Sequence, residues 1–167
     1  AANHAGTTPT ALRHDAGLAA AKVNVFLRQL VEKSGGVATV GCIEFKPNAI
    51  NVIPSKAVFT VDLRNPDKEK LDNDEKILAA YLKDLAKEDD VKISTEHLTE
   101  FDPVPFDEGI VEKVEKAAKA HGLSVRRITS GAGQDAQMIA RICPTAMIFV
   151  PSVKGISHNP EEYTKDE

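Results

Sequence analysis

The sequence predicts an α+β domain followed by an incomplete α/β segment, and three observations carry this prediction. In the first part of the chain, apolar residues recur at helical spacing and then alternate as they do along strands. A stretch with two prolines, residues 101–105, then indicates a linker. Beyond it, a helical pattern leads to a continuous apolar run at 146–150, which is typical of a strand buried on both faces of a parallel sheet.

Residues 1–105 are expected to form an antiparallel sheet with two helices on one face. Thr8-Pro9 indicates the start of the first helix, because threonine caps helices and proline favours the first helical position. The glycines after Ser34 end this helix. Its apolar face comprises Val23, Phe26, Leu27 and Leu30.

Alternation predicts strands at 37–45, 57–64 and 91–95, and periodicity predicts a second helix at 68–87. In the strand at 57–64, the core-facing residues are Ala57, Phe59, Val61 and Leu63. The charged residues at 68–75 and 83–90 are expected on the solvent side of the second helix.

Residues 106–167 are expected to be part of an α/β domain. A helix that begins near Ile110 is followed by a short strand at 124–128, a glycine-rich turn, a further helix and the buried strand at 146–150. Two such strands alone make a poor sheet, and no helix follows the last one. The chain is therefore expected to be truncated at its C-terminus.

Composition excludes several classes of function. The formal net charge is −4 with no basic patch, which argues against nucleic acid as a partner. No apolar run reaches the ~20 residues of a membrane span, and residues 1–9 lack the layout of a signal peptide. Cys42 and Cys143 lie in apolar sequence, so they are expected to be buried free thiols in a reducing compartment. These features favour a cytoplasmic protein.

Several polar residues are candidates for chemistry, each with a simpler alternative. His158 follows the predicted buried strand, where open α/β sheets bind ligands, and could bind a divalent metal; a solvated loop histidine is the alternative. His4 could be an exposed residue beside a helix cap. Arg64 could pair with Asp62 at the surface, and Asn51 could be a turn residue.

The glycine-rich turn Ser130–Gly133 opens a predicted helix. Its backbone N–H groups could hold an anion or an oxyanion, although short turns of this kind are common.

Taken together and in order, these segments resemble one enzyme family, the amidase, hydantoinase and carbamoylase group of dinuclear-metal amidohydrolases. That group includes N-carbamoyl-L-amino-acid hydrolase, allantoate amidohydrolase and β-ureidopropionase. The resemblance covers almost the whole chain. The matching blocks are His4–Pro9, Pro47–Pro54, Asp62–Arg64, Ser130–Gly133 with Asp135-Ala136, and Phe149–Ser152 with Gly155–His158.

The resemblance implies a catalytic domain with two metal ions, Zn or Mn, and an inserted lid domain through which two copies form a homodimer. Residues 1–105 would be the lid without its first strand, and 106–167 the returning part of the catalytic domain. Such enzymes release ammonia and carbon dioxide from small N-carbamoyl or allantoate-like substrates that bear a free carboxylate.

The resemblance also implies roles for single residues. His158 would be a metal ligand. Arg64 would clamp the substrate carboxylate, because a guanidinium fork matches it at two points, and Asn51 would hydrogen-bond near the same group. The backbone around Gly133 would contact the substrate. His4 would reach into the neighbouring subunit and stabilise the oxyanion that forms when water adds to the carbamoyl carbon.

Two features set this chain apart from a complete enzyme. The family's other metal ligands and its general-base glutamate precede the lid, so the chain alone is expected to neither hold the metal pair nor catalyse. Gln134 stands where the family usually has histidine, and glutamine cannot carry a proton. This predicts weaker turnover or another substrate preference.

Two alternatives to an amidohydrolase remain open. One is a non-catalytic lid and dimerisation module, and the other is a peptidase, which Arg64 together with Asn51 makes less favoured.

Overall fold

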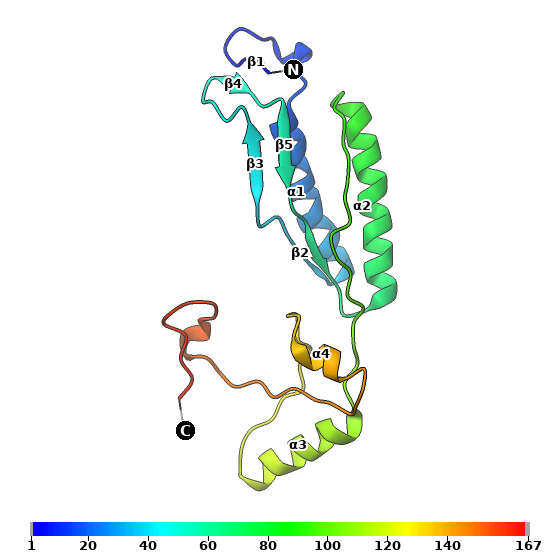
Figure 1. The fold of residues 1–167 in the computed structure, drawn as a ribbon, viewed down its shortest axis with the longest axis vertical. Coiled ribbons are helices and arrows are strands. Elements are labelled where there is room, and N and C mark those ends of the chain that lie inside the picture. The colour runs from blue at the N-terminus through cyan, green and yellow to red at the C-terminus, as the bar shows by residue number, and fades with distance from the viewer. Residues whose placement is uncertain (1, 166–167) are drawn as a thin grey trace. The chain divides into compact units, whose positions relative to one another are not determined.

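A computed structural model describes residues 2–165 of the chain and divides into two compact units, Ala1–Pro103 and Val104–Glu167. Unit 1 is a small α+β assembly in which helices pack on short antiparallel strand pairs (Figure 1). The predicted combination of helices with antiparallel strands is therefore confirmed for unit 1. Its elements are β1 (Asn3–His4), the 3-10 turn η1 (Thr10–Leu12), α1 (Ala16–Ser34), β2 (Val37–Thr39), β3 (Ile43–Lys46), β4 (Val52–Ile53), β5 (Lys56–Phe59), β6 (Asp62–Arg64) and α2 (Lys68–Glu88).

The strands of unit 1 form a long antiparallel ribbon with a small pair at its tip. β3 pairs with β5, and β2 continues the ribbon by pairing with β6. The predicted strand 37–45 is thus interrupted, because residues 40–42 bulge between its two halves and Thr60 N–H donates to the Cys42 carbonyl at 3.1 Å. At the tip, β1 pairs with β4.

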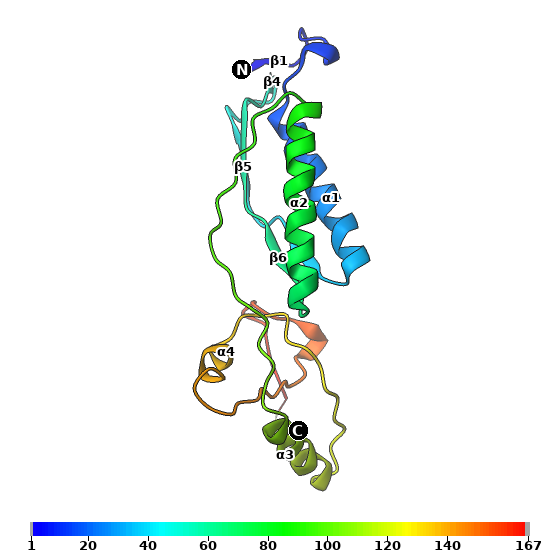
Figure 2. The same cartoon turned by 90° about the vertical axis from the view of Figure 1, so that its right-hand side faces the viewer.

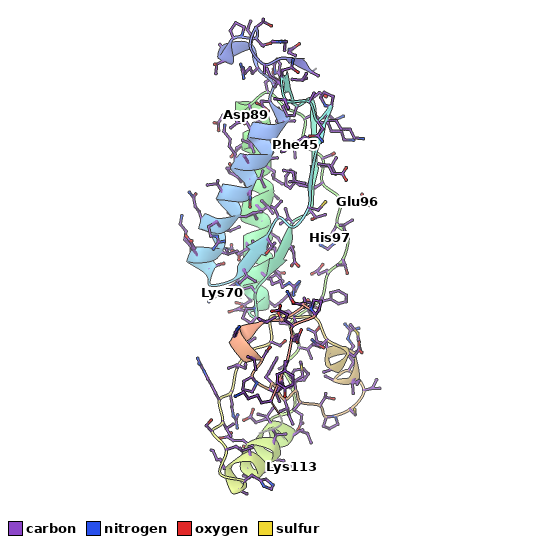
Figure 3. The ribbon with its side chains drawn as sticks, turned by 90° about the vertical axis from the view of Figure 1, so that its left-hand side faces the viewer. Phe45, Lys70, Asp89, Glu96, His97 and Lys113 are labelled. Carbon is purple, nitrogen blue, oxygen red and sulfur yellow. The ribbon has the colours of Figure 1, made fainter. Side chains whose placement is uncertain are left out.

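Both helices lie on the same side of the ribbon (Figure 2). Val23, Leu27 and Leu85 are each 1% exposed and form the centre of the core together with Ala19. Phe45 lies on the helix-facing side of β3 (Figure 3), where its ring would be 3.6 Å from a Cβ placed on Gly17. This packing fixes the ribbon against the first turn of α1.

The first helix begins later than the sequence predicted. Pro9 precedes only the short turn η1, and α1 begins at Ala16. The cap is Asp15, whose carboxylate accepts hydrogen bonds from the N–H groups of Gly17 and Leu18. The predicted end is correct, since Gly35 follows Ser34 in the left-handed conformation, with φ 80°, that glycine adopts without strain.

Two further predictions for unit 1 are wrong. No strand forms at 91–95 among the described residues, although Val91 and Ile93 pack on the core. The alternation of apolar residues shows which side of the segment is buried. A strand also needs the backbone of a second strand to pair with. Val61, expected in the core, is 36% exposed because the ribbon breaks between β5 and β6.

The expectation that all charges of α2 face solvent fails at Asp74. This residue follows Leu71 by three positions, so it falls on the apolar face of the helix and is 1% exposed. Neither carboxylate oxygen has a hydrogen-bond partner in the structure. A buried carboxylate without a partner destabilises the folded state.

Replacing Asp74 with asparagine should therefore stabilise the chain. Asp74→Asn keeps the shape and removes the buried charge, so we expect the free energy of unfolding to rise by about 1–2 kcal/mol. Urea denaturation at neutral pH measures this change. Asp84→Asn removes the same charge from an exposed position of α2 and should change stability by less than ~0.5 kcal/mol. Lower stability of Asp74→Asn would show that the carboxylate has a stabilising partner.

Unit 2 contains two helices and a short turn, α3 (Glu108–Ala120), α4 (Asp135–Ile139) and η2 (Val153–Gly155). The predicted helix near Ile110 is confirmed, but the strands at 124–128 and 146–150 are absent from the described part of the chain. Within unit 2 no described residue is buried, and Ile148 in the expected buried strand is 71% exposed. A fully buried strand needs layers on both sides, which residues 104–165 do not supply.

Two smaller findings concern the cysteines and membranes. Cys42 and Cys143 are free but exposed, so the prediction of buried thiols is wrong. Both lie in irregular segments between elements, where apolar neighbours in sequence do not produce burial. Among the described residues, no helix combines the length and apolar character needed to cross a bilayer.

Candidate functional site

The structure brings His4 and Asn51 together at the tip of the ribbon. His4 lies opposite Val52 in the β1–β4 pair, and the N–H of Ala5 donates to the Asn51 carbonyl at 2.8 Å. Both His4 and Asn51 are exposed. The pairing of β1 with β4 (Figure 1) therefore brings two residues that are far apart in sequence, and that separate motifs contain, onto neighbouring backbone.

Arg64 lies at the other end of the ribbon, opposite Val37. Its Nε donates to Asp62 Oδ1 at 2.8 Å and its Nη2 donates to Asp62 Oδ2 at 2.5 Å. These hydrogen bonds lower the pKa of Asp62, outweighing the opposite effect of partial burial, so Asp62 is a carboxylate at neutral pH. Arg64 thus takes part in the surface ion pair that the sequence had offered as an alternative, and the pair orients its guanidinium.

One small molecule cannot contact both ends of the ribbon on a single chain. From Lys56 to Arg64 the ribbon is roughly 26 Å long at about 3.3 Å per residue, and Asn51 lies beyond Lys56. On a single chain Asn51 therefore lies with His4 and away from Arg64. The roles that the resemblance implies for Asn51 and Arg64 stay predictions. If His4 and Arg64 both contact substrate, they serve two different sites or come from two chains.

In unit 2, Gly133 and Gln134 lie at the start of α4. Gln134 is exposed, and its N–H donates to the side chain of Gln137 at 3.3 Å. The N–H of Ala132 is engaged by the hydroxyl of Ser130 at 3.2 Å. Because these N–H groups already have partners inside the turn, they are not open donors for an anion. The predicted roles of Gly133 and Gln134 stay predictions.

His158 occupies a tight turn near the end of unit 2. Its φ is 54°, and its N–H donates to Glu162 Oε2 at 2.9 Å. Within residues 2–165, no three or more histidine, cysteine, aspartate or glutamate side chains gather as a metal site would require. A dinuclear centre needs several ligands per ion, so the donors among the described residues do not by themselves fit one.

Sequence reasoning missed Arg13, which lies between η1 and α1. Its guanidinium donates to the carbonyls of Ala5 and Thr8, and so it holds the loop that carries His4. Nothing in the local pattern separates Arg13 from an ordinary surface arginine. The available signal was indirect: a loop that contains glycine and proline leaves carbonyl groups that need donors.

Unit 1 is thus an α+β unit that presents His4 at one end of its ribbon and the Asp62–Arg64 ion pair at the other. Residues 5–167 match the family described as peptidase family M20/M25/M40. The chain belongs to this family, and the relationship indicated by its motifs is confirmed by the relatives and structures it matches.

Three relatives illustrate the similarity. The chain is 42% identical over 161 residues to the N-carbamoyl-L-amino-acid amidohydrolase of Rhizobium meliloti, covering 95% of the chain and 39% of that protein. It is 38% identical over 167 residues to the allantoate amidohydrolase of Escherichia coli strain K12, covering 97% and 40%. It is also 38% identical over 168 residues to the ureidoglycolate hydrolase of Arabidopsis thaliana, covering 98% and 35%.

Solved structures give the same picture. An amidase of the hydantoinase/carbamoylase family from Burkholderia multivorans matches with a TM-score of 0.94 at 38% identity, covering 99% of the chain and 41% of that protein. A member from Burkholderia vietnamiensis matches with a TM-score of 0.90 at 38% identity, covering 99% and 40%. The chain thus spans 35–41% of the length of these relatives.

Proposed function

We propose that this chain is the substrate-binding part of a longer amidohydrolase that cleaves a linear amide C–N bond in N-carbamoyl amino acids or allantoate-like molecules. One observation carries this proposal. The tip of the ribbon presents His4 and Asn51, and the far end of the same ribbon presents Arg64, whose guanidinium is oriented by Asp62. A hydrogen-bond donor for a developing oxyanion and a clamp for a carboxylate are what such a reaction requires.

In this proposal, unit 1 is a lid and unit 2 is part of the catalytic domain. His158 is one ligand of a metal centre, and the remaining ligands lie outside this chain. The exposed apolar surface of unit 2 supports this role, because Ile142, Ile148 and Val150 are 85%, 71% and 65% exposed. Side chains of this kind are normally covered in a complete domain.

Unit 1 also joins two copies in a homodimer. The outer face of α1 carries Leu18 and Val25, which are 52% and 60% exposed. They line a shallow apolar groove with Phe26, whose ring stacks on Tyr81 of α2 at 3.7 Å. In a dimer, one copy supplies His4 and Asn51 to a site and the other supplies Arg64, which accounts for the separation of these residues along the ribbon.

The test is metal content together with ammonia release from an N-carbamoyl-L-amino acid, measured with added Zn or Mn. We expect the isolated chain to hold no metal pair and release no ammonia, and a longer form with the full length of the relatives to do both. Two metals per isolated chain, with turnover, would contradict the proposal that this chain is incomplete. A longer form that cleaves dipeptides but no carbamoyl substrate would favour a peptidase.

The second candidate is a non-catalytic module for association. It is favoured by the same groove on α1 and by the absence of a fitting metal-ligand set within residues 2–165. A longer form that dimerises but neither binds metal nor releases ammonia would support it.

A further inference from the structure

The loop that carries His4 is closed by its own hydrogen bonds. The carbonyl of His4 accepts from the N–H of Thr8 at 3.2 Å and from the hydroxyl of Thr8 at 2.8 Å. The neighbouring N–H of Ala5 donates to the Asn51 carbonyl, so the loop is also fixed to β4. The side chain of His4 is exposed, but these hydrogen bonds fix the backbone that carries it.

A hydrogen bond within this loop sets which ring nitrogen of His4 carries the proton. The N–H of Gly6 donates to Nδ1 of His4 at 3.0 Å, so Nδ1 acts as an acceptor. In a neutral imidazole the proton then resides on Nε2, which becomes the donor. Glycine at position 6 permits this close approach of the His4 ring. A Cβ at residue 6 would lie only 3.2 Å from Cε1 of His4, a tight contact that would push the ring away.

Arg13 holds this arrangement from outside the loop. Its Nη2 donates to the Ala5 carbonyl at 2.6 Å and its Nε donates to the Thr8 carbonyl at 3.1 Å. The two carbonyls lie on either side of Gly6, and the planar fork of arginine fixes their separation. Arg13 is half-buried, and hydrogen bonds from a charged donor are stronger than neutral ones.

We propose that Arg13 is a positioning residue for His4: by bridging the Ala5 and Thr8 carbonyls, it keeps Gly6 N–H on Nδ1 and thereby presents Nε2–H as the oxyanion donor. This inference rests on the proposed function for the role of the donor, but the tautomer itself is a property of the loop. A lysine at position 13 would keep the charge and lose the second contact, since its single ammonium cannot reproduce the fork.

The tautomer can be measured without turnover by NMR of the chain labelled with ¹⁵N-histidine, in which Nδ1 and Nε2 give distinct signals. We expect His4 to be the Nε2–H tautomer in the wild type and a mixture of both tautomers in Arg13→Met. Arg13→Lys should lie between them. Arg28→Met removes an exposed arginine from α1 and should leave the His4 signals unchanged.

A second variant keeps the test decisive if Arg13→Met does not fold. Gly6→Ala leaves Arg13 in place and pushes the ring off the N–H of residue 6, so it should also give a mixture. A single Nε2–H tautomer retained in a folded Arg13→Met, or in Gly6→Ala, overturns the inference.

Kinetics of the longer form separate this inference from the proposed function. Arg13→Met should lower kcat roughly tenfold to a hundredfold with little change in KM, because a misplaced donor weakens transition-state stabilisation and not substrate binding. Arg13→Lys should recover part of this loss. If the tautomer changes while kcat does not, the oxyanion role of His4 fails, and Arg13's role in turnover fails with it.

Discussion

A dimer that combines a His4→Ala protomer with a His158→Ala protomer should show activity that neither variant has as a homodimer. If His4 serves the partner's site and His158 its own, one site of the mixed dimer keeps both histidines. Loss of an oxyanion donor lowers kcat by ~10²–10³-fold, so the His4→Ala homodimer should be nearly inactive. The mixed dimer should recover about half of the wild-type activity, since one of its two symmetric sites is intact.

The mixed dimer can be isolated from the longer form by giving each protomer a different affinity tag. His97→Ala in place of His4→Ala is the matched control, because His97 is an exposed histidine of unit 1 that lies away from the tip (Figure 3). A homodimer of His97→Ala should be active. A mixed dimer as inactive as both homodimers would show that His4 and His158 act in the same chain. A fully active His4→Ala homodimer would show that His4 has no catalytic role.

Replacing Arg64 with methionine should remove most of the preference for substrates with a carboxylate. Each hydrogen bond to a charged group contributes ~1.5–3 kcal/mol, and a bidentate clamp makes two of them. We therefore expect Arg64→Met to lower kcat/KM on an N-carbamoyl amino acid by ~10²–10⁴-fold, mainly through KM. Arg64→Lys should recover only part of this loss, because an ammonium group binds a carboxylate at one point.

The control is a substrate change. An alkylurea, which has no carboxylate, should be a poor substrate for the wild type and should be hydrolysed about equally well by Arg64→Met. The fold should survive, since Arg64 and Asp62 have side chains 48% and 50% exposed, and such a pair contributes at most ~1 kcal/mol. Equal losses on both substrates would contradict the clamp and indicate a general structural effect.

Local patterns in the sequence predicted those elements of unit 1 that are determined by neighbouring residues, such as a helix cap or an alternating apolar run. α2 begins at Lys68 as expected because Asp67 caps it, and α1 ends at Ser34 because Gly35 then adopts the left-handed conformation. Alternation also predicted a single strand at 57–64, which forms as β5 and β6 with a break at residues 60 and 61. In each case the information lies within a few residues, so the sequence contains it.

Predictions that depended on distant partners were wrong. The expected strands at 91–95, 124–128 and 146–150 have suitable residues, but none of them pairs with a strand among residues 2–165, and a sheet is held by hydrogen bonds between paired strands. Asp74 looked like a surface charge because the helix is highly charged; its burial follows from the packing of α2 against the core.

For the candidate site, the sequence by itself determined which residues to consider, because the order of the motifs is specific to a family whose membership the comparisons confirm. Only the tertiary structure decided how they group. The β1–β4 pair puts Asn51 beside His4, and the length of the ribbon separates both from Arg64. It also identified Arg13, whose contacts with two carbonyls leave no pattern in sequence. The reason is physical: strand pairing and backbone hydrogen bonds join residues through the folded chain, and those distances are set only when it folds.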